Sequence, residues 1–337
     1  MPEVEGEFEY RVPAEWEPRA GTLLAWPQVD QAWSGLYPAV QDTFVHLQRL
    51  LREVEPVTIL VSPDEQSTIA RLLGGEDRES LTLLPLPTND IWMRDAGPIG
   101  AWRTSGDAPE AVLLDGHFNA WGEKYPHGLD SLIPLMLARR WHRRRLPLPF
   151  RVEGGAVDCD GCGHLLTTES VLLDPNRENP GRSELEAGLG HYFGARHIHW
   201  LGSGLTGDDT DGHVDNLARF VAPGQVVCPG PDVPSGHPDA DTLAEAHRRL
   251  SAAGLEVIAL PVPEPVRIQG RHQPASYANF YLAADRVLLP AFGQASDQQA
   301  IGVMQDLFPD RQVVGLDARA VLAQGGAIHC LAQPLLW

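Results

Sequence analysis

The feature that most constrains the fold of this chain is a recurring pairing of short apolar runs with proline. Proline has no backbone N–H and cannot extend a central strand, so an apolar run that meets proline predicts a short strand with a defined end. The pattern occurs at Trp26-Pro27, at Gly97-Pro98 with Ile99, and at 171–175, 226–229 and 287–290. We therefore expect many short strands.

The last three of these runs belong to a longer repeating order. Each follows a polar turn and an earlier apolar run, at 164–168, 217–222 and 279–283. Helical segments come next at 183–193, 240–253 and 297–308, and then strands at 197–201, 256–260 and 312–315. A unit of hairpin, helix and strand, used about five times, favours a radial or solenoid array. No linker rich in Gly, Ser or Pro divides the chain, so we predict one α/β domain over residues 1–337.

The N-terminal part shows the same alternation of helix and strand. Apolar residues at Val40, Phe44 and Leu47 keep a helical spacing within the segment 37–52. Strands are expected at 21–27, 57–61 and 81–86, with a short helix at 69–73 that ends at two glycines.

Charge limits the partners that the chain can take. Its 337 residues carry 26 Lys and Arg against 45 Asp and Glu, a formal charge of −19. Nucleic-acid binding depends on cationic side chains that neutralise phosphates, so we expect no nucleic-acid partner. An acidic field attracts cations, which favours a small cationic ligand.

Nothing in the sequence indicates a membrane. No apolar run approaches the ~20 residues that cross a bilayer, and the acidic N-terminus lacks the basic start and apolar core of a signal peptide. We predict a cytoplasmic protein without a membrane partner. A homo-oligomer is compatible with the sequence, which does not fix the oligomeric state.

The stretch from Gly207 to Asn216 contains the first candidate catalytic residues. It begins with turn-forming residues and runs into an apolar segment that predicts a strand. On a strand, His213 and Asp215 project from the same face, and an imidazole beside a carboxylate suits proton transfer. The alternative is a solvated acidic turn with one surface histidine.

A second candidate segment, 89–98, places carboxylates and a tryptophan before a strand. Asp90, Trp92, Arg94 and Asp95 lie together there. Arg94 is expected either to pair with Asp90 or Asp95 as a structural clamp or to serve the site. Further along, Glu153 stands in an apolar run before two glycines, and a buried carboxylate needs a partner.

His213 is the natural partner for Glu153; the alternative is an exposed glutamate at a strand end. Near the C-terminus, Cys330 follows a glycine-rich turn. A single Cys is often a buried apolar filler, but with a histidine and carboxylates elsewhere in the chain it also suits a thiolate nucleophile.

Other motifs are expected to be structural. Cys159-Asp160-Gly161-Cys162 has no second cysteine pair to complete a zinc site, and its central Asp-Gly predicts a hairpin turn. His197 and His199 alternate on a strand and are expected at the surface, and the basic run 139–145 is expected to be a solvated helix end. The acidic loop 208–215 lacks the twelfth-position glutamate of an EF-hand. We predict no metal.

Together, several long motifs resemble those of the agmatine deiminases, within the guanidino-group-modifying (pentein) superfamily. The resemblance spans nearly the whole chain, and its segments are 12–18, 92–95, 118–126, 153–155, 211–215 and 275–281. It implies a five-bladed pseudo-symmetric α/β propeller, a single pentein-type domain, and hydrolysis of agmatine to N-carbamoylputrescine and ammonia.

The resemblance also implies the roles of individual residues. Cys330 would be the nucleophile, His213 the general acid and base, and Glu153 the partner of His213. Asp95 and Asp215 would hold the guanidinium, while Trp92 and Trp121 would enclose the aliphatic stem of a small ligand. The chain departs from the family near Ala327 and after Cys330, where Leu331-Ala332 replaces the usual Thr-Gln.

This chemistry needs no cofactor. Two carboxylates fix the guanidinium plane, the thiolate attacks its carbon, and the histidine protonates the departing ammonia and later activates water. Three alternatives remain: a bacterial peptidyl-arginine deiminase with the same catalytic residues, a metal-dependent hydrolase using His213, Asp215 and Cys330, and a non-catalytic binding propeller. The sequence does not identify the residue that binds the distal amine.

Overall fold

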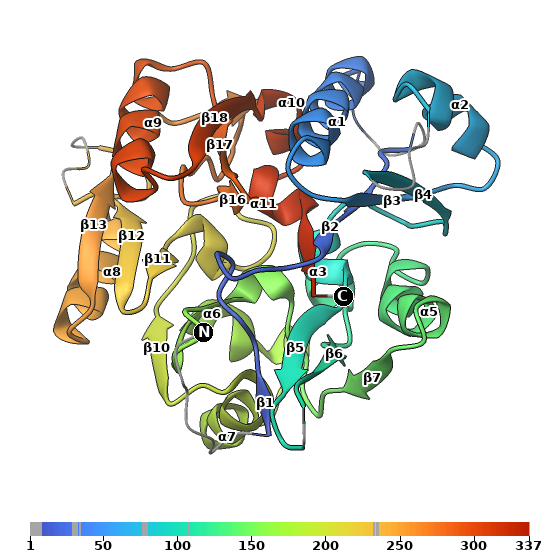
Figure 1. The fold of residues 1–337 in the computed structure, drawn as a ribbon. Helices are drawn as coiled ribbons and strands as arrows, with labels where there is room; N and C mark the ends of the chain where they lie inside the picture. Colours follow the sequence, from blue (N-terminus) through green and yellow to red (C-terminus); the bar gives the residue numbers. More distant parts are fainter. Residues whose placement is uncertain are drawn as a thin grey trace.

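The strands of the computed structural model fall into several separate sheets (Figure 1). The structure describes residues 9–336, apart from 29–32, 34, 76–79, 107, 232, 234 and 235. Within these residues there are five sheets of three or four strands and one two-stranded hairpin, β14 (Arg267–Ile268) with β15 (Arg271–His272).

All five sheets share one pairing pattern. Two strands pair antiparallel, and a third strand pairs parallel with the second of them. In chain order these strands are β5 (Ile99–Arg103), β6 (Glu110–Asp115) and β7 (Arg144–Pro147); β8 (Val157–Cys159), β9 (His164–Thr168) and β10 (His197–Leu201); β11 (Arg219–Ala222), β12 (Gln225–Pro229) and β13 (Glu256–Leu260); β16 (Tyr281–Leu282), β17 (Arg286–Ala291) and β18 (Gln312–Asp317).

The fifth sheet joins the two ends of the chain. The C-terminal strand β19 (Gln333–Leu335) pairs antiparallel with β2 (Gly21–Ala25), which pairs parallel with β3 (Val57–Val61). A fourth strand, β4 (Leu81–Pro85), extends this sheet, and β1 (Tyr10–Arg11) extends the sheet of β5. The C-terminus accordingly lies beside β2 in Figure 1.

A helix fills each parallel crossover, as expected because parallel strands need a long return connection. The crossover helices are α1 (Tyr37–Arg52), α5 (Ile133–Arg140), α7 (Arg182–Phe193), α8 (Ala240–Ala252) and α9 (Ala295–Leu307). Their apolar faces are buried; in α1 these residues include Val40, Phe44 and Leu47. The shorter helices are α2 (Gln66–Leu72), α3 (Met93–Ala96), α4 (Ala120–Glu123), α6 (Glu169–Leu172), α10 (Arg319–Leu322) and α11 (Ile328–Leu331).

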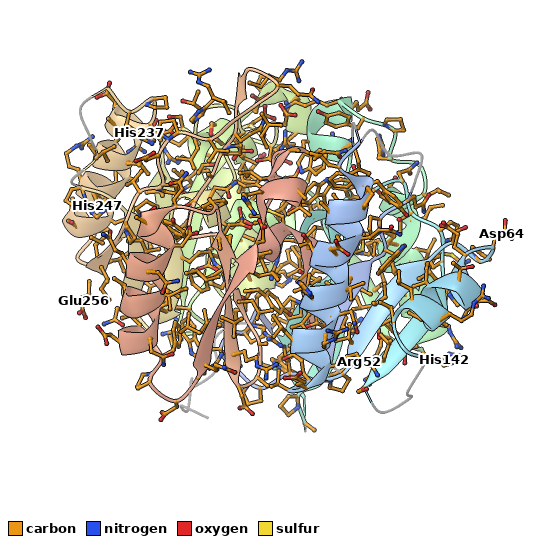
Figure 2. The ribbon with its side chains drawn as sticks, turned by 90° about the horizontal axis from the view of Figure 1, so that it is seen from above. Arg52, Asp64, His142, His237, His247 and Glu256 are labelled. Atoms are coloured by element: carbon orange, nitrogen blue, oxygen red, sulfur yellow. The ribbon has the colours of Figure 1, made fainter. Side chains whose placement is uncertain are left out.

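Packing leaves polar side chains at the periphery. In Figure 2 the labelled side chains of Asp64, His142 and Glu256 lie at the outer edge, and side chains fill the space between the ribbons. The largest buried cluster joins α1 and the sheets of β2 and β17, and two further clusters fill the other sheets. Among the described residues, no helix is long and apolar enough to span a membrane.

The predicted strands and helices are largely confirmed, with two corrections. Residues 171–173 were expected to be a strand, but they belong to α6 and the turn after it. The antiparallel partner of β9 is β8, and the turn between them is the predicted hairpin at Asp160-Gly161. The short helix expected at 69–73 begins earlier, at Gln66.

Candidate active site

Four of the seven predicted site residues line one large pocket, and the other three, Glu153, His213 and Asp215, do not line it. It has a volume of about 680 Å³, and its lining includes Cys330, Asp95, Trp92, Trp121 and Asn216. The acidic residues Asp90 and Asp209 also line it, together with Tyr125 and Arg271. A pocket with carboxylates and aromatic walls suits a cationic ligand with an apolar stem.

Each sheet supplies the site with the short segment that precedes its first strand. These segments are α3 before β5, the 3₁₀ turn Gly154–Ala156 before β8, the 3₁₀ turn Val214–Asn216 before β11, the turn 276–279 before β16, and α11 before β19. Asp95, Glu153, His213, Asp215 and Cys330 all lie in these segments or next to them. Residues far apart in sequence therefore converge.

Gly155 marks the point of convergence. A Cβ at this residue would lie 2.6 Å from His213 Nδ1, 2.9 Å from Asp95 Oδ1 and 3.1 Å from Asp215 Oδ2. The three side chains thus surround a position that only glycine leaves open. Gly155 also donates its backbone N–H to Asp95 Oδ1 over 2.9 Å.

Cys330 is buried between Asp215 and Asn279. Its Sγ lies 3.7 Å from Asp215 Oδ2 and accepts a hydrogen bond of 3.2 Å from the Asn279 amide. Asn279 holds the adjoining residue as well, because its side-chain oxygen accepts the backbone N–H of His329 over 3.0 Å. Burial raises the pKa of the Cys330 thiol well above its ordinary value, and the charges of Asp215 and Asp95 raise it further.

Asp95 is held by two donors. Besides Gly155, the indole N–H of Trp121 donates to Asp95 Oδ2 over 3.1 Å. Burial raises the pKa of Asp95 to about 6, with His213 acting against the shift and Asp215 adding to it. The carboxyl group is therefore ionised at neutral pH and is protonated under mildly acidic conditions.

His213 is fully buried among carboxylates. Its Nδ1 lies 3.6 Å from Asp95 Oδ2 and its Nε2 lies 3.8 Å from Glu153 Oε2, which are ion-pair rather than hydrogen-bond distances. Burial alone would lower the pKa of His213, but the neighbouring charges of Asp95 and Glu153 outweigh it and raise the pKa to about 9. At neutral pH the ring is an imidazolium.

Glu153 lies closer to Arg177 than to His213. Its Oε1 accepts a hydrogen bond of 2.7 Å from the buried guanidinium of Arg177. Arg177 in turn donates to Asp211 Oδ2 over 2.6 Å and to the backbone oxygen of Thr210 over 2.9 Å. Burial would raise the pKa of Glu153, but His213 and Arg177 hold it below its ordinary value.

Trp92 and Trp121 form part of the pocket wall, as predicted. A Cβ on Gly326 would lie 2.3 Å from the Trp92 ring, so the glycine-rich turn before Cys330 packs directly on that indole. Trp121 contacts Phe118 and Tyr125 edge-on.

Lys124 and Tyr125, which follow α4, hold the acidic loop 208–215 by hydrogen bonds. Lys124, the only lysine of the chain, donates to Asp211 Oδ1 over 2.5 Å and to the backbone oxygen of Asp209 over 2.6 Å. Tyr125 donates to Asp209 Oδ2 over 2.8 Å.

One expectation about this region is wrong. His213 and Asp215 were placed on a strand, but Val214–Asn216 is a 3₁₀ turn and β11 begins only at Arg219. The Asp208 side chain accepts from the Thr210 N–H and from the Asn216 amide, and these bonds hold the backbone in a compact loop.

Arg94 does not pair with its neighbour Asp95. Its guanidinium donates to Glu15 Oε2 over 2.7 Å, so it does have a structural role but with a carboxylate distant in sequence. Arg94 lines a second, smaller pocket of about 70 Å³, whereas the cation in the lining of the large pocket is Arg271.

The motifs expected to be structural lie elsewhere. Cys159 and Cys162 are free thiols flanking the β8–β9 turn. His199 is half-buried rather than exposed and accepts or donates a 2.9 Å hydrogen bond with His164. Within the described residues, no group of three or more His, Cys, Asp or Glu side chains is arranged to hold a metal ion.

Sequence reasoning missed four residues next to the site: Asn279, Arg177, His329 and Glu15. Asn279 and Glu15 lie in segments that carried the family resemblance, 275–281 and 12–18, and His329 precedes the cysteine, so position gave a signal for these three. Arg177 follows a turn with no distinguishing motif.

The site brings together a buried thiol, an imidazolium and several carboxylates, which are groups that hydrolases use for covalent catalysis and for binding cations. Comparison with known proteins narrows this class. The model of the Porphyromonas-type peptidyl-arginine deiminases matches residues 11–335. A putative agmatine deiminase of Legionella pneumophila subsp. pneumophila is 35% identical, covering 97% of this chain and 95% of that protein.

Solved structures agree with the sequence comparison. The agmatine deiminase of Enterococcus faecalis matches with a TM-score of 0.88 at 29% identity, covering 99% of this chain and 98% of the other. A Cys-to-Ser variant of C. jejuni agmatine deiminase with substrate bound matches with a TM-score of 0.87 at 25% identity, covering 97% and 96%. The chain belongs to the Porphyromonas-type peptidyl-arginine deiminase family, and its relatives include agmatine deiminases.

Proposed function

We propose that this protein hydrolyses agmatine to N-carbamoylputrescine and ammonia through a covalent intermediate on Cys330. The observation that carries the proposal is that Cys330 and Asp95 line one acidic pocket, while His213 and Asp215 meet Asp95 at Gly155. The similarity to agmatine deiminases supports the choice of substrate. The five sheets with one pairing pattern, each contributing its leading segment, support a single five-bladed α/β propeller over residues 1–337.

The two aspartates bind the guanidinium. A guanidinium is planar and presents paired N–H groups, so two carboxylates fix its plane by charge-assisted hydrogen bonds. Asp215 Oδ1 is buried and has no hydrogen-bond partner among the described residues, which leaves it open to a ligand. Asp95 already accepts from Gly155 and Trp121, and these donors fix its orientation.

Substrate binding also activates the nucleophile. In the free enzyme the carboxylates around Cys330 favour the thiol over the thiolate. A bound guanidinium neutralises part of that negative charge and lowers the thiol pKa. The reactive thiolate therefore forms when its target is present.

The chemistry takes two steps. The Cys330 thiolate forms a C–S bond with the guanidinium carbon, and the His213 imidazolium protonates one amino group, which leaves as ammonia. In the second step neutral His213 accepts a proton from water, and the hydroxide attacks the same carbon. The C–S bond then breaks to return the thiolate, and the new hydroxyl group releases its proton to solvent, which leaves a neutral urea. Glu153, anchored by Arg177, stabilises the imidazolium form of His213.

The pocket chemistry disfavours a carboxylate on the substrate. Asp90 and Asp209 line the pocket, so the primary amine of agmatine finds acceptors there. The carboxylate of arginine meets the same anions and only the exposed Arg271 as a lining cation. We expect a kcat/KM for agmatine at least ~100-fold above that for arginine, about 2.7 kcal/mol of discrimination.

The test compares ammonia release from agmatine, arginine and an arginine-containing peptide. Arg271→Ala should leave agmatine turnover within about 3-fold and lower that of arginine further, because only arginine needs the cation. A preference for the peptide would instead identify a peptidyl-arginine deiminase with the same catalytic residues, and equal values for agmatine and arginine would contradict the substrate assignment.

The nucleophile is tested separately. Cys330→Ala should abolish turnover. Mass spectrometry of quenched wild-type enzyme should show an enzyme-bound adduct, and the same measurement on Cys330→Ala should show none. Cys228→Ala, at another buried thiol, is the matched control and should retain most activity. Turnover by Cys330→Ala would refute the covalent mechanism, and loss of turnover on exhaustive chelation would favour the metal-dependent alternative.

A further inference from the structure

A buried histidine beside the nucleophile has no part in the two steps above. His329 precedes Cys330 in α11, and its side chain is 1% exposed. Its Nδ1 lies 2.7 Å from Asp215 Oδ2 and its Nε2 lies 2.9 Å from Glu15 Oε2. Both ring nitrogens therefore face carboxylates.

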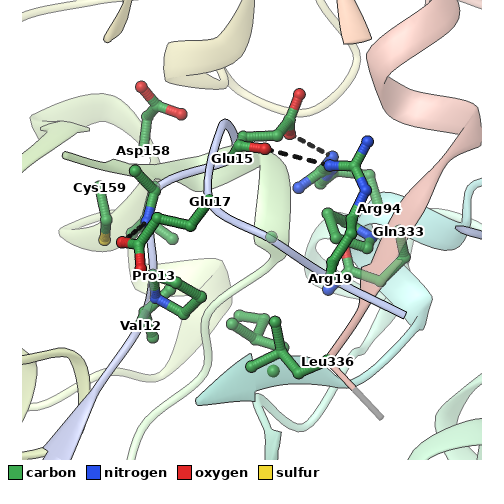
Figure 3. Close-up of a pocket in the computed structure, with 16 residues that line it drawn as sticks. Val12, Pro13, Glu15, Glu17, Arg19, Arg94, Asp158, Cys159, Gln333 and Leu336 are labelled. Atoms are coloured by element: carbon green, nitrogen blue, oxygen red, sulfur yellow. Dashed lines mark hydrogen bonds and ion pairs between the residues drawn. The ribbon is translucent and has the colours of Figure 1, made fainter. Parts of the chain in front are cut away.

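The partners of Glu15 show that it is ionised. Glu15 Oε2 accepts from Arg94, Oε1 accepts the backbone N–H of Leu282 over 2.8 Å, and Arg219 lies 3.2 Å from Oε1. Figure 3 shows Glu15 turned toward Arg94, with Asp158 on its other side. Burial would raise the pKa of Glu15, but Arg219, His329 and Arg94 hold it well below its ordinary value.

Two ionised acceptors define the protonation of the ring between them. A neutral imidazole has one N–H and would point a lone pair at one of the carboxylates, whereas an imidazolium donates to both. The charged groups around His329 are Glu15, Asp215 of the 3₁₀ turn, Arg94 of α3, Arg219 of β11 and Asp158 of β8. Asp158 is itself paired with Arg219 over 2.8 Å.

The position of His329 in the fold is that of a site residue. His329 lies four residues before Gln333, the first residue of β19. Asp95 lies four residues before Ile99, the first residue of β5, and Asp215 lies four residues before Arg219, the first residue of β11. Glu153 precedes Val157 in β8 by that interval too. Three of the four residues at this position in the other sheets bear on the guanidinium or on His213; the fourth, Tyr277 before β16, bonds to Ser296 and Asp297 instead.

We propose that His329 is a positioning residue, an imidazolium that clamps Asp215 Oδ2 so that Asp215 Oδ1 faces the substrate guanidinium. Glu15 holds the far side of the ring and so links the N-terminal segment to the site. The proposal rests on the function proposed above, because it takes Asp215 as a ligand of the guanidinium.

Two substitutions separate the two ends of the ring. The amide nitrogen of His329→Asn can occupy the place of Nδ1 and keep the bond to Asp215. His329→Gln reaches the place of Nε2 and keeps the bond to Glu15. We expect His329→Gln to lower kcat/KM for agmatine at least ~10-fold more than His329→Asn does, mainly by raising KM.

The pH profile distinguishes positioning from a structural role. His329 lowers the pKa of Asp215 against the effect of burial. Loss of the imidazolium should therefore raise the pKa of Asp215 in both variants, and further in His329→Gln, so that Asp215 joins Asp95 in setting the acid limb of kcat/KM and moves that limb to higher pH. Equal kinetic losses with an unmoved limb, or a greater loss in His329→Asn, would overturn the proposal.

The wild-type enzyme offers a test that needs no variant to be active. In ¹⁵N NMR at pH 7, the His329 ring should show two protonated nitrogens, with its signals assigned by their absence from His329→Asn. A neutral ring would overturn the proposal. If wild-type enzyme fails to release ammonia from agmatine, the proposed function fails; if it is active but His329→Gln matches it, only this inference fails.

Discussion

At the residue scale, the site depends on the absence of a side chain at Gly155. A Cβ at this residue would meet His213, Asp95 and Asp215, and the Gly155 N–H orients Asp95. Proximity of this kind is sensitive to small displacements, since an error of about 1 Å can cost ~100-fold in rate.

Gly155→Ala should therefore lower kcat/KM at least ~100-fold, because the new Cβ displaces the imidazole and both carboxylates. Gly128→Ala is the matched control, since a Cβ there meets nothing within 4 Å. Steady-state kinetics and thermal denaturation of both variants check the prediction, and near-wild-type activity in Gly155→Ala would contradict the geometry.

The pH dependence of kcat/KM follows from two site residues. Asp95 must be ionised to bind the guanidinium, so activity should fall as the pH drops through about 6. His213 must be protonated to act as the acid, so activity should also fall as the pH rises through about 9. A bell-shaped profile with these limbs is expected. A maximum outside this window would show that other groups control the rate.

Much of the candidate site was predictable from residue types together with the family resemblance. Cys330, His213, Asp95 and Asp215 were predicted together and do border one pocket or meet at Gly155. Arg177 and Glu15 were not, because a buried ion pair between residues distant in sequence leaves no local pattern. The actual partner of Arg94, Glu15, was missed for the same reason.

At the element scale, the backbone of α4 carries Trp121 in an unusual conformation. Ala120, Trp121, Gly122 and Glu123 all have positive φ, at 51°, 57°, 94° and 62°. Residues other than glycine are strained at positive φ. The run places the Trp121 indole against Asp95, which no propensity for helix or strand predicts.

Ala120→Gly should raise the free energy of unfolding by about 1 kcal/mol, because glycine adopts a φ of 51° without strain. Ala244, an exposed residue inside α8, is the matched control, and the opposite change in the free energy of unfolding is expected there. Ala244→Gly should cost about 1 kcal/mol. Chemical denaturation measures both, and destabilisation by Ala120→Gly would contradict the assigned backbone.

Sequence patterns predicted regular elements better than loops. α1 and β3 have the predicted bounds because apolar periodicity sets them. The loop before β11 was misassigned, since side-chain hydrogen bonds from Asp208, rather than periodicity, decide its path. The segments of the candidate site lie in such loops, so their identity was predictable while their conformation was not.

At the scale of the whole molecule, the two ends of the chain meet in one sheet. β19 pairs with β2, and the Gln333 amide donates to Pro98 O over 2.8 Å, which links this sheet to that of β5. The recurring units were visible in the sequence, but this closure was not, because strand pairing across the length of the chain leaves no local signal.

A single domain should unfold in one cooperative transition. Leu335→Ala, in the buried closing strand β19, should lower the free energy of unfolding by about 2–5 kcal/mol and shift that transition as a whole. Leu132→Ala, at a side chain that is 49% exposed, should change it by less than about 0.5 kcal/mol. Two separate calorimetric transitions would contradict a single domain.

The solitary lysine has a practical consequence. Lys124 is partly exposed and bonded to the loop of Asp209 and Asp211, beside the pocket. An amine-reactive fluorophore therefore has one side-chain target in the entire polypeptide. Labelling there would attach an optical reporter next to the pocket without any engineered handle, and protection of this amine by a bound ligand would give a direct readout of occupancy.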